Sequence, residues 1–287
     1  MFNGETWPER RSRQAPAPGR GIKILADRLS IYVSSFDDYA DIWPVFFARF
    51  FTYWPDCPFP IYLGTVSKIY GDERVLPVHA ADHKNWSSRA VEHLEQLKSP
   101  YVLMMLEDFM LDRPVDNVLL DRLVTLMDRL DLHAIRLYPE PAPALAMPGV
   151  PLIGYQSEGQ LNRTSTHATI WRRESLLELI RPGESLWEFE INGSIRSNRF
   201  AGGICGCWRP AIHYVMAIGK GRWFRRALRA LARDGIRPDL SIRAAETLPE
   251  ELKGELFAFI GYALRAVMPL YWRQRLQLKF NPRAYRN

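Results

Sequence analysis

The sequence has few cysteines. Its three thiols, Cys57, Cys205 and Cys207, are too few for the disulfide framework of a small secreted protein. Cys205 and Cys207 are separated by one residue, which is tighter than the usual zinc knuckle, and no pair of histidines stands near them. We therefore expect ordinary buried or half-buried thiols and no zinc site.

The sequence also lacks a long apolar segment. Its longest apolar stretch, residues 256–272, is interrupted by Arg265 and Pro269, whereas a membrane-spanning helix needs about 20 apolar residues. Residues 1–21 are rich in proline, arginine and glycine and have no apolar core of a signal peptide. These features predict a disordered tail over residues 1–22 and a cytoplasmic protein.

Acidic residues are scarce after position 220, although the formal net charge of the whole chain is only +6. The excess of basic residues there indicates contact with a polyanion, either an anionic membrane surface or a phosphorylated ligand. Five arginines share one face of a helix expected over residues 222–234: Arg222, Arg225, Arg226, Arg229 and Arg233. This pattern is typical of a helix on the inner face of a membrane. The alternative is a helix docked on the protein with a solvated basic face. No groove-reading motif accompanies it, so no nucleic-acid partner is expected.

Short apolar runs alternate with amphipathic segments over residues 23–220, which predicts an α/β fold with a mainly parallel, Rossmann-like sheet flanked by helices. The expected strands are residues 30–34, 60–65, 74–79, 101–106, 134–138, 166–171 and 211–218. The expected helices are residues 39–54, 86–97 (capped by Ser87 or Ser88), 174–180 and 222–234, one helix capped by Asp116, and one opened by a Ser185–Glu188 capping box. Residues 221–287 would form a basic helical extension packed on this domain.

Residues 100–113 are the most informative stretch of the chain. The apolar run 101–106 predicts a central, fully buried strand, and it ends in the adjacent carboxylates Glu107 and Asp108, with Asp112 beyond. In open α/β sheets the carboxyl end of a central strand is where ligands bind. Hard-oxygen ligands there suit Mg²⁺ or Mn²⁺ holding a diphosphate. A strand that runs into an acidic turn is the simpler interpretation.

Three features together resemble a known family: a first strand followed by residues 34–38 (S-S-F-D-D), a helix from Trp86, and the motif P-Y-V-L-M-M-L-E-D-F at residues 100–109. They look like the N-terminal half of a nucleotide-sugar-dependent glycosyltransferase of the GT-A fold. The segment W-E-F-E at residues 187–190 resembles the acceptor-side acidic segment of that fold. The later G-K-G-R-W-F is similar to segments of small bacterial polysaccharide-biosynthesis transferases. The resemblance covers residues 30–220.

The resemblance implies roles for individual residues. Donor binding would fall to the loop residues Ser34, Ser35, Asp37 and Asp38, and to Glu107 and Asp108, which stand where the family has Asp-x-Asp and would hold Mg²⁺ or Mn²⁺. The sequence departs from that motif, because the two acids are adjacent and Phe109 takes the third place. Arg89, Lys220 or Arg222 could add positive charge at the phosphates.

The catalytic base would be Glu190 or Glu188, acting on the acceptor hydroxyl. The capping box already explains Glu188, so Glu190 is preferred. Trp187 is either a core residue or a platform for a sugar face. His167 and His213 lie in apolar surroundings and are interpreted as core residues rather than metal ligands.

The expected function is transfer of a sugar from a nucleotide-sugar donor to a glycan or lipid-linked acceptor, in the synthesis of a bacterial surface polysaccharide. One alternative is a metal-dependent phosphoryl-transfer enzyme, such as a phosphatase, nuclease or nucleotidyltransferase, which would need further acids or histidines to hold two metals. Another is a non-catalytic module that binds a nucleotide or a glycan.

Overall fold

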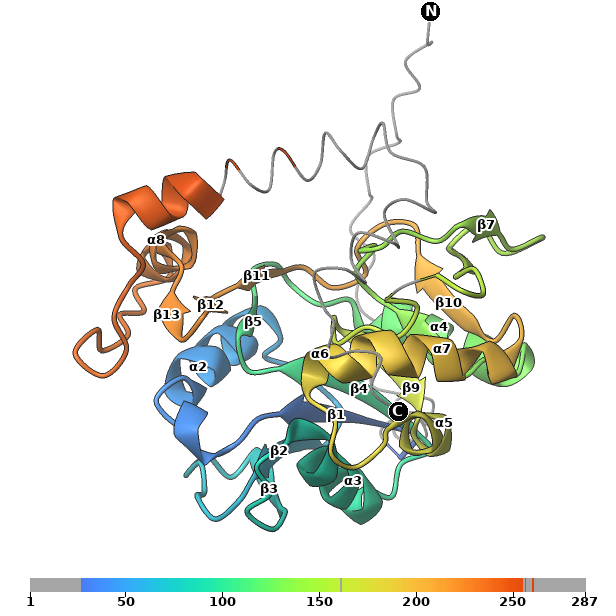
Figure 1. Cartoon of the computed structure of the whole chain (residues 1–287), viewed down its shortest axis with the longest axis horizontal. Helices are drawn as coiled ribbons and strands as arrows, with labels where there is room; N and C mark the ends of the chain where they lie inside the picture. Colours follow the sequence, from blue (N-terminus) through green and yellow to red (C-terminus); the bar gives the residue numbers. More distant parts are fainter. Residues whose placement is uncertain (1–26, 161, 255, 257–259, 261–287) are drawn as a thin grey trace, which may run out of the picture.

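The computed structural model describes residues 27–160, 162–254, 256 and 260, and the expected tail over residues 1–22 lies outside this range (Figure 1). A nine-stranded sheet has the order β3-β2-β1-β4-β9-β6-β10-β8-β7. Its strands are β1 (Leu29–Ser34), β2 (Ile61–Thr65), β3 (Val75–His79), β4 (Tyr101–Leu106), β6 (Ala134–Arg136), β7 (Leu145–Ala146), β8 (Ile153–Tyr155), β9 (Thr169–Arg172) and β10 (Ile204–Cys207). The expected strand over residues 101–106 is confirmed to the residue.

Most strands of this sheet share one direction. β1 pairs in parallel with β2 and with β4, β2 with β3, and β6 with β10. β9 is inserted between β4 and β6 and is antiparallel to both, and β8 is antiparallel to its neighbours β10 and β7. The expected fold class, a mainly parallel α/β sheet flanked by helices, is therefore confirmed.

Helices cover both faces of the sheet because its strands are apolar on both sides. Along β4, Leu103 and Met105 belong to one hydrophobic cluster, and Val102 and Met104 belong to another. The first cluster includes the buried sides of α2 (Trp43–Tyr53) and α4 (Asn117–Arg129); the second includes those of α3 (Trp86–Gln96) and α5 (Arg173–Leu179).

The helix caps were predicted with mixed success. Asp116 caps α4, since its Oδ1 accepts hydrogen bonds from the backbone N–H groups of Val118 and Leu119 at 2.9 and 3.1 Å. The cap of α3 is Asn85, whose Oδ1 accepts from the Ser88 N–H at 2.9 Å, so the prediction of Ser87 or Ser88 was wrong. Asn85 has the extended backbone of an N-cap, whereas Ser87 and Ser88 already lie in the first turn of the helix.

The expected single strand over residues 211–218 was also wrong. Tyr214–Met216 (β11) pairs with Phe109–Leu111 (β5), and Ile218–Gly219 (β12) pairs with Arg222–Trp223 (β13). Between them, the Ala217 N–H donates to the Asp108 carbonyl at 2.8 Å and the Ala217 carbonyl accepts from the Phe224 N–H at 2.8 Å. The segment therefore pairs with β5 before Ala217 and with β13 after it, and Ala217 itself is bonded to the turn that follows β4.

The C-terminal basic helix is α8 (Arg225–Arg233), which lies beside β12 and β13 in Figure 1. Its apolar side is occupied, because Ala227 and Leu231 are fully buried in the cluster that also contains α2. Arg225 and Arg229 both form ion pairs with Glu251. The docked arrangement is therefore the observed one, and contact of the basic face with an anionic membrane stays a prediction. Within the described residues, no helix combines the length and hydropathy needed to span a bilayer.

The three cysteines are free thiols. Cys205 and Cys207 lie buried in β10, and burial raises the pKa of each to about 12. Both are therefore protonated and unreactive at neutral pH.

Candidate functional site

A cavity of about 730 Å³ opens where β1 and β4 end. Its wall comes from the loop after β1, the start of α3, the turn after β4, residues 183–190 and the segment 216–224. Eight of the ten site residues expected from the sequence line it: Ser34, Ser35, Arg89, Glu107, Asp108, Glu188, Glu190 and Lys220. The fold thus brings together residues that are up to 186 positions apart in the chain, from Ser34 to Lys220.

The acid pair Glu107–Asp108 forms the turn between β4 and β5 at the inner end of this cavity. Burial and the neighbouring Asp108 raise the pKa of Glu107 well above its usual range, and Arg243 and Arg89 act in the opposite direction. Burial likewise raises the pKa of Asp108 to about 7. Neither carboxylate forms an ion pair within the described residues. Two adjacent carboxylates that are buried (Glu107) or half-buried (Asp108) and form no ion pair are costly to ionise together, so this position favours an incoming cation.

The serine hydroxyls at the end of β1 are held by tryptophans. The indole N–H of Trp86 donates to Ser34 Oγ at 2.9 Å, and that of Trp43 donates to Ser35 Oγ at 2.8 Å. Because Trp86 starts α3 and Trp43 starts α2, these bonds fix the β1 loop against both helices. The loop is therefore preorganised at the cavity wall.

Arg89 supplies positive charge to the same wall. Its guanidinium donates through Nη1 to the His83 carbonyl and lies over the Phe36 ring, 4.6 Å from the centroid. The buried Nε has no hydrogen-bond partner in the described part of the chain. Arg89 lines the cavity, so its positive charge suits a phosphate group there.

Glu190 lies in a π-helical turn, Phe189–Gly193, on the opposite side of the cavity. Its Oε1 accepts hydrogen bonds from the Thr166 N–H at 2.8 Å and from Thr166 Oγ1 at 2.7 Å. No donor among the described residues bonds Oε2. In this widened turn the Glu190 carbonyl accepts a hydrogen bond from the Ser194 hydroxyl at 2.5 Å. Such π turns often occur at functional sites.

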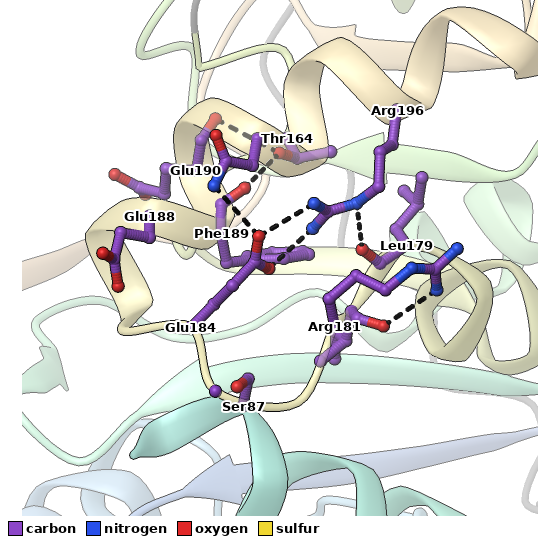
Figure 2. A network of polar contacts seen from close by, with 12 residues as sticks. Ser87, Thr164, Leu179, Arg181, Glu184, Glu188, Phe189, Glu190 and Arg196 are labelled. Carbon is purple, nitrogen blue, oxygen red and sulfur yellow. Dashed lines mark hydrogen bonds and ion pairs between the residues drawn. The ribbon is translucent and has the colours of Figure 1, made fainter. Parts of the chain in front are cut away.

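A polar network beneath this turn holds it in place (Figure 2). Glu184 accepts two hydrogen bonds from Arg196, at 2.8 and 2.6 Å, and one from Asn192 Nδ2 at 3.0 Å. The Glu184 carbonyl in turn accepts from the Ser87 N–H of α3 at 3.2 Å. The segment that contains Glu190 is therefore tied to the sheet-covering helices.

Glu188 has the structural role expected from the capping box. Its Oε2 accepts from the Ser185 N–H at 2.7 Å, while Ser185 Oγ accepts from the Glu188 N–H at 3.2 Å. Glu188 also lines the cavity. The capping box accounts for the Glu188 carboxylate by a local structural role, so Glu190 stays the preferred candidate for a base.

His167 and Trp187 both lie at the cavity wall rather than in the core. His167 is partly buried but lines the cavity, with its Nδ1 bonded to the Tyr214 hydroxyl and its ring stacked on Phe109 at 5.4 Å. Trp187 is 71% exposed at the cavity wall, so its interpretation as a core residue was wrong.

Asp37, expected to bind the donor, does not line the cavity. Its carboxylate accepts hydrogen bonds from the backbone N–H groups of Val66, Ser67 and Lys68 and from Ser67 Oγ, at 2.8–3.1 Å. Burial opposes ionisation, but these hydrogen bonds outweigh it and lower the pKa of Asp37. The expected donor contact was therefore wrong for Asp37, because a loop 30 residues away uses its carboxylate. Asp38, also expected at the donor, is exposed and does not line the cavity either.

We expect Asp37→Ala to lower the free energy of unfolding by about 2 kcal/mol at pH 7, since charge-assisted hydrogen bonds are removed. Asp38→Ala is the matched control and should leave stability unchanged. Because the native pKa of Asp37 is lowered, its contribution is present at neutral pH and is lost as the pH falls through that pKa. Urea unfolding of both variants at pH 7 and in acid measures the difference; equal stabilities of the two variants at pH 7 would contradict this role.

Arg243 was missed in the sequence. It forms an ion pair with Asp41 through two bonds of 2.9 Å and donates to the carbonyls of Asp38 and Gly221 at 3.3 Å. Its guanidinium also lies over the Tyr39 ring, 4.8 Å from the centroid. The C-terminal part of the chain thus joins the β1 loop to the turn of Lys220 and Gly221, and no local pattern announces a contact over 202 positions.

Lys220 reaches the cavity from a tight turn between β12 and β13. Both turn residues have positive φ, 51° at Lys220 and 75° at Gly221, as a two-residue hairpin requires. The third candidate acid, Asp112, does not line the cavity, because β5 has already left it for the pairing with β11.

No protein-family model matches the sequence, and no curated protein matches it. Some solved structures do match, among them GT-A-type glycosyltransferases. TarS residues 1–349 of S. aureus in complex with UDP-GlcNAc has a TM-score of 0.45 and 12% identity, over 66% of this chain and 58% of that chain. Glucosyl-3-phosphoglycerate synthase from M. tuberculosis, in complex with Mn²⁺ and UDP-glucose, has a TM-score of 0.41 and 14% identity, over 81% and 86%. The bifunctional IspDF from Campylobacter jejuni has a TM-score of 0.39 and 13% identity, over 66% and 52%.

The match spans less than two thirds of the length of TarS and of IspDF. All three TM-scores are below 0.5. Similarities this low do not establish a function, so the residues of the cavity have to indicate it.

Proposed function

We propose that the chain is a glycosyltransferase that moves a sugar from a nucleotide-sugar donor to a hydroxyl of a glycan or lipid-linked acceptor, in the synthesis of a bacterial surface polysaccharide. The observation that supports this most is the cavity in which the acids Glu107 and Asp108, which form no ion pair with a described residue, share the space with Arg89 and Glu190. The donor would occupy the side formed by the β1 loop, and the acceptor would enter beside Glu190.

Glu107 and Asp108 fit a divalent cation, because they offer adjacent hard-oxygen ligands that form no ion pair with the described residues. Mg²⁺ in proteins is commonly held by one or two carboxylates together with phosphate oxygens and waters. When bound, the ion would neutralise negative charge that develops on the leaving nucleoside diphosphate.

Side chains of the cavity would bind the donor and remove the proton of the acceptor. Arg89 and Lys220 would bind the diphosphate, and the tryptophan-anchored Ser34 and Ser35 would orient the nucleoside. Glu190 Oε2 would take the proton of the acceptor hydroxyl, while Thr166 keeps Oε1 fixed.

The alternatives predict different products. A phosphatase would release inorganic phosphate and a nucleotidyltransferase pyrophosphate, whereas a non-catalytic module would return the donor unchanged. The described residues contain no group of three or more His, Cys, Asp or Glu side chains placed to hold a metal, which is fewer ligands than a two-metal site usually has.

The test is incubation of the purified protein with a panel of nucleotide sugars, with and without Mn²⁺, followed by chromatography of the products. Slow release of nucleoside diphosphate and free sugar is the expected result, because water can replace a missing acceptor. In parallel, Mn²⁺ together with a nucleoside diphosphate should raise the melting temperature of the protein. Absence of both effects with every nucleotide would refute the proposal.

A further inference from the structure

The cavity mouth presents a large apolar side chain to solvent. Trp187 is 71% exposed, and its indole makes no hydrogen bond or ring contact with any described residue. A tryptophan side chain can bury 150–250 Å² on contact, and exposed tryptophans are strongly enriched among residues that dominate binding. Its exposure therefore leaves considerable binding energy unused in the free protein.

The position of Trp187 is rigid. It is the middle residue of α6 (Leu186–Glu188), whose first turn is closed by the reciprocal hydrogen bonds of Ser185 and Glu188. Directly before α6, Glu184 is fixed by its two bonds to Arg196. A ring presented from such a base loses little conformational freedom on binding.

Trp187 also has a defined relation to Glu190. The two residues are three positions apart in a continuous helical segment, so they lie on the same side of it, and both line the cavity. A flat ligand stacked on the indole would therefore extend over the side of the segment from which Glu190 reaches the cavity.

The surroundings of Trp187 are polar. Glu188 and Ser185 are its neighbours on α6, and Lys84 and Asn85 line the same cavity. A lipid chain or an apolar protein surface would have to desolvate these groups, at a cost. A pyranose ring, in contrast, offers an apolar C–H face for the indole and a rim of hydroxyls for the polar groups.

We propose that Trp187 is the stacking platform for a sugar ring of the acceptor. This inference rests on the proposed transfer reaction, and it deepens it by assigning a carbohydrate, rather than only a lipid or a small alcohol, to the acceptor side. Trp187 acts as a specificity-determining residue. It binds the ring that bears the reacting hydroxyl, or the ring next to it, and delivers that hydroxyl toward Glu190.

Binding of carbohydrate to the full chain tests the platform without any need for turnover. Saturation-transfer NMR is recorded with a panel of hexose and N-acetylhexosamine oligosaccharides and with three variants, Trp187→Ala, Trp187→Phe and Trp208→Ala. Trp208 is 39% exposed and does not line the cavity, so its replacement is the matched control. We expect at least one oligosaccharide to bind the wild type through one face of a ring, to bind Trp187→Phe and Trp208→Ala, and to lose binding to Trp187→Ala.

Kinetics then separate this inference from the proposed function. With an acceptor that binds, Trp187→Ala should raise the acceptor KM about tenfold, equivalent to the loss of one aromatic contact. The control Trp208→Ala should keep the wild-type rate of donor hydrolysis without acceptor, because Trp208 does not line the cavity. If the wild type binds oligosaccharides through Trp187 but neither binds nor hydrolyses any nucleotide sugar, the proposed function fails and the carbohydrate platform stands.

Any of the following results would overturn the platform. One is oligosaccharide binding that is the same in Trp187→Ala and the wild type, or no oligosaccharide binding by the wild type. Another is a loss of donor binding in Trp187→Ala as large as the loss of acceptor binding, which would assign the residue to the donor. The last is flotation with neutral phosphatidylcholine vesicles that Trp187→Ala abolishes, which would make the residue a lipid anchor.

Discussion

Asp108→Asn is expected to reduce sugar transfer by a factor of about 1,000 or more while the protein stays folded. The substitution keeps the volume of the side chain but removes the negative charge that would hold the cation and the donor diphosphate. It also removes a buried group whose ionised form is unfavourable in the free protein. A loss of activity without a loss of stability is the signature of a residue that serves a ligand rather than packing.

The stability side of this prediction has a definite sign. Burial raises the folded-state pKa of Asp108 to about 7, above its value of about 3.9 in an unfolded chain. As the pH rises from about 4 to about 7, the unfolded state ionises first, so the wild type without cation loses stability over this window. Asn does not titrate, and at pH 8 the melting temperature of Asp108→Asn should equal or exceed that of the wild type.

Scanning calorimetry at pH 5 and pH 8, combined with donor hydrolysis, measures both parts. Asp112→Asn is the control, since this acid does not line the cavity and should retain activity. If Asp108→Asn lost melting temperature at pH 8 in proportion to its activity, Asp108 would be a structural residue.

Local signals explain what the sequence predicted well. The strand over residues 101–106 is apolar on both faces because helices cover both faces of the sheet. A continuous apolar run of this short length is typical of such a fully buried strand. The Ser185–Glu188 capping box is equally local, because both hydrogen bonds join residues three positions apart. The acids do follow this strand directly, but Glu107 stays buried rather than lying outside the core as the cost of a buried charge predicted.

Contacts between distant residues explain what the sequence did not predict. Asp37 was expected at the donor, but it binds the backbone of residues 66–68, and no periodicity links those positions. The expected strand over residues 211–218 is divided because Ala217 bonds across to Asp108 and Phe224. The sequence left Trp187 either in the core or as a platform for a sugar, and the fold excludes the core, because the short helix that bears Trp187 turns its side chain outward.

The choice between Glu188 and Glu190 involves both a local signal and a contact between distant residues. The partner of Glu188 is three residues away and could be found in the sequence, whereas the partner of Glu190 is Thr166, 24 positions away, and needed the fold. The preference for Glu190 came from the absence of a local explanation for its charge. The structure adds a geometric reason, because its Oε1 is fixed while Oε2 has no donor among the described residues.

Glu190→Gln should therefore lower kcat by a factor of about 100 to 10,000, the usual contribution of a general base, with donor binding unchanged. The amide oxygen of Gln can still accept the two hydrogen bonds from Thr166, so the π turn should keep its shape. The amide nitrogen that replaces Oε2 cannot take a proton from the acceptor hydroxyl.

Glu188→Gln is the matched control, because Gln at this position also closes a capping box and should leave kcat close to the wild-type value. Steady-state transfer rates and donor titrations of both variants, with circular dichroism to confirm the fold, separate the two roles. If Glu190→Gln turned over normally and Glu188→Gln did not, the base would be Glu188. The capping hydrogen bond at Ser185 would then have to open during each cycle, and the rate should respond to Ser185→Ala. If both variants were fully active, neither glutamate would be the base, and another group in the cavity, such as His167, would have to remove the proton.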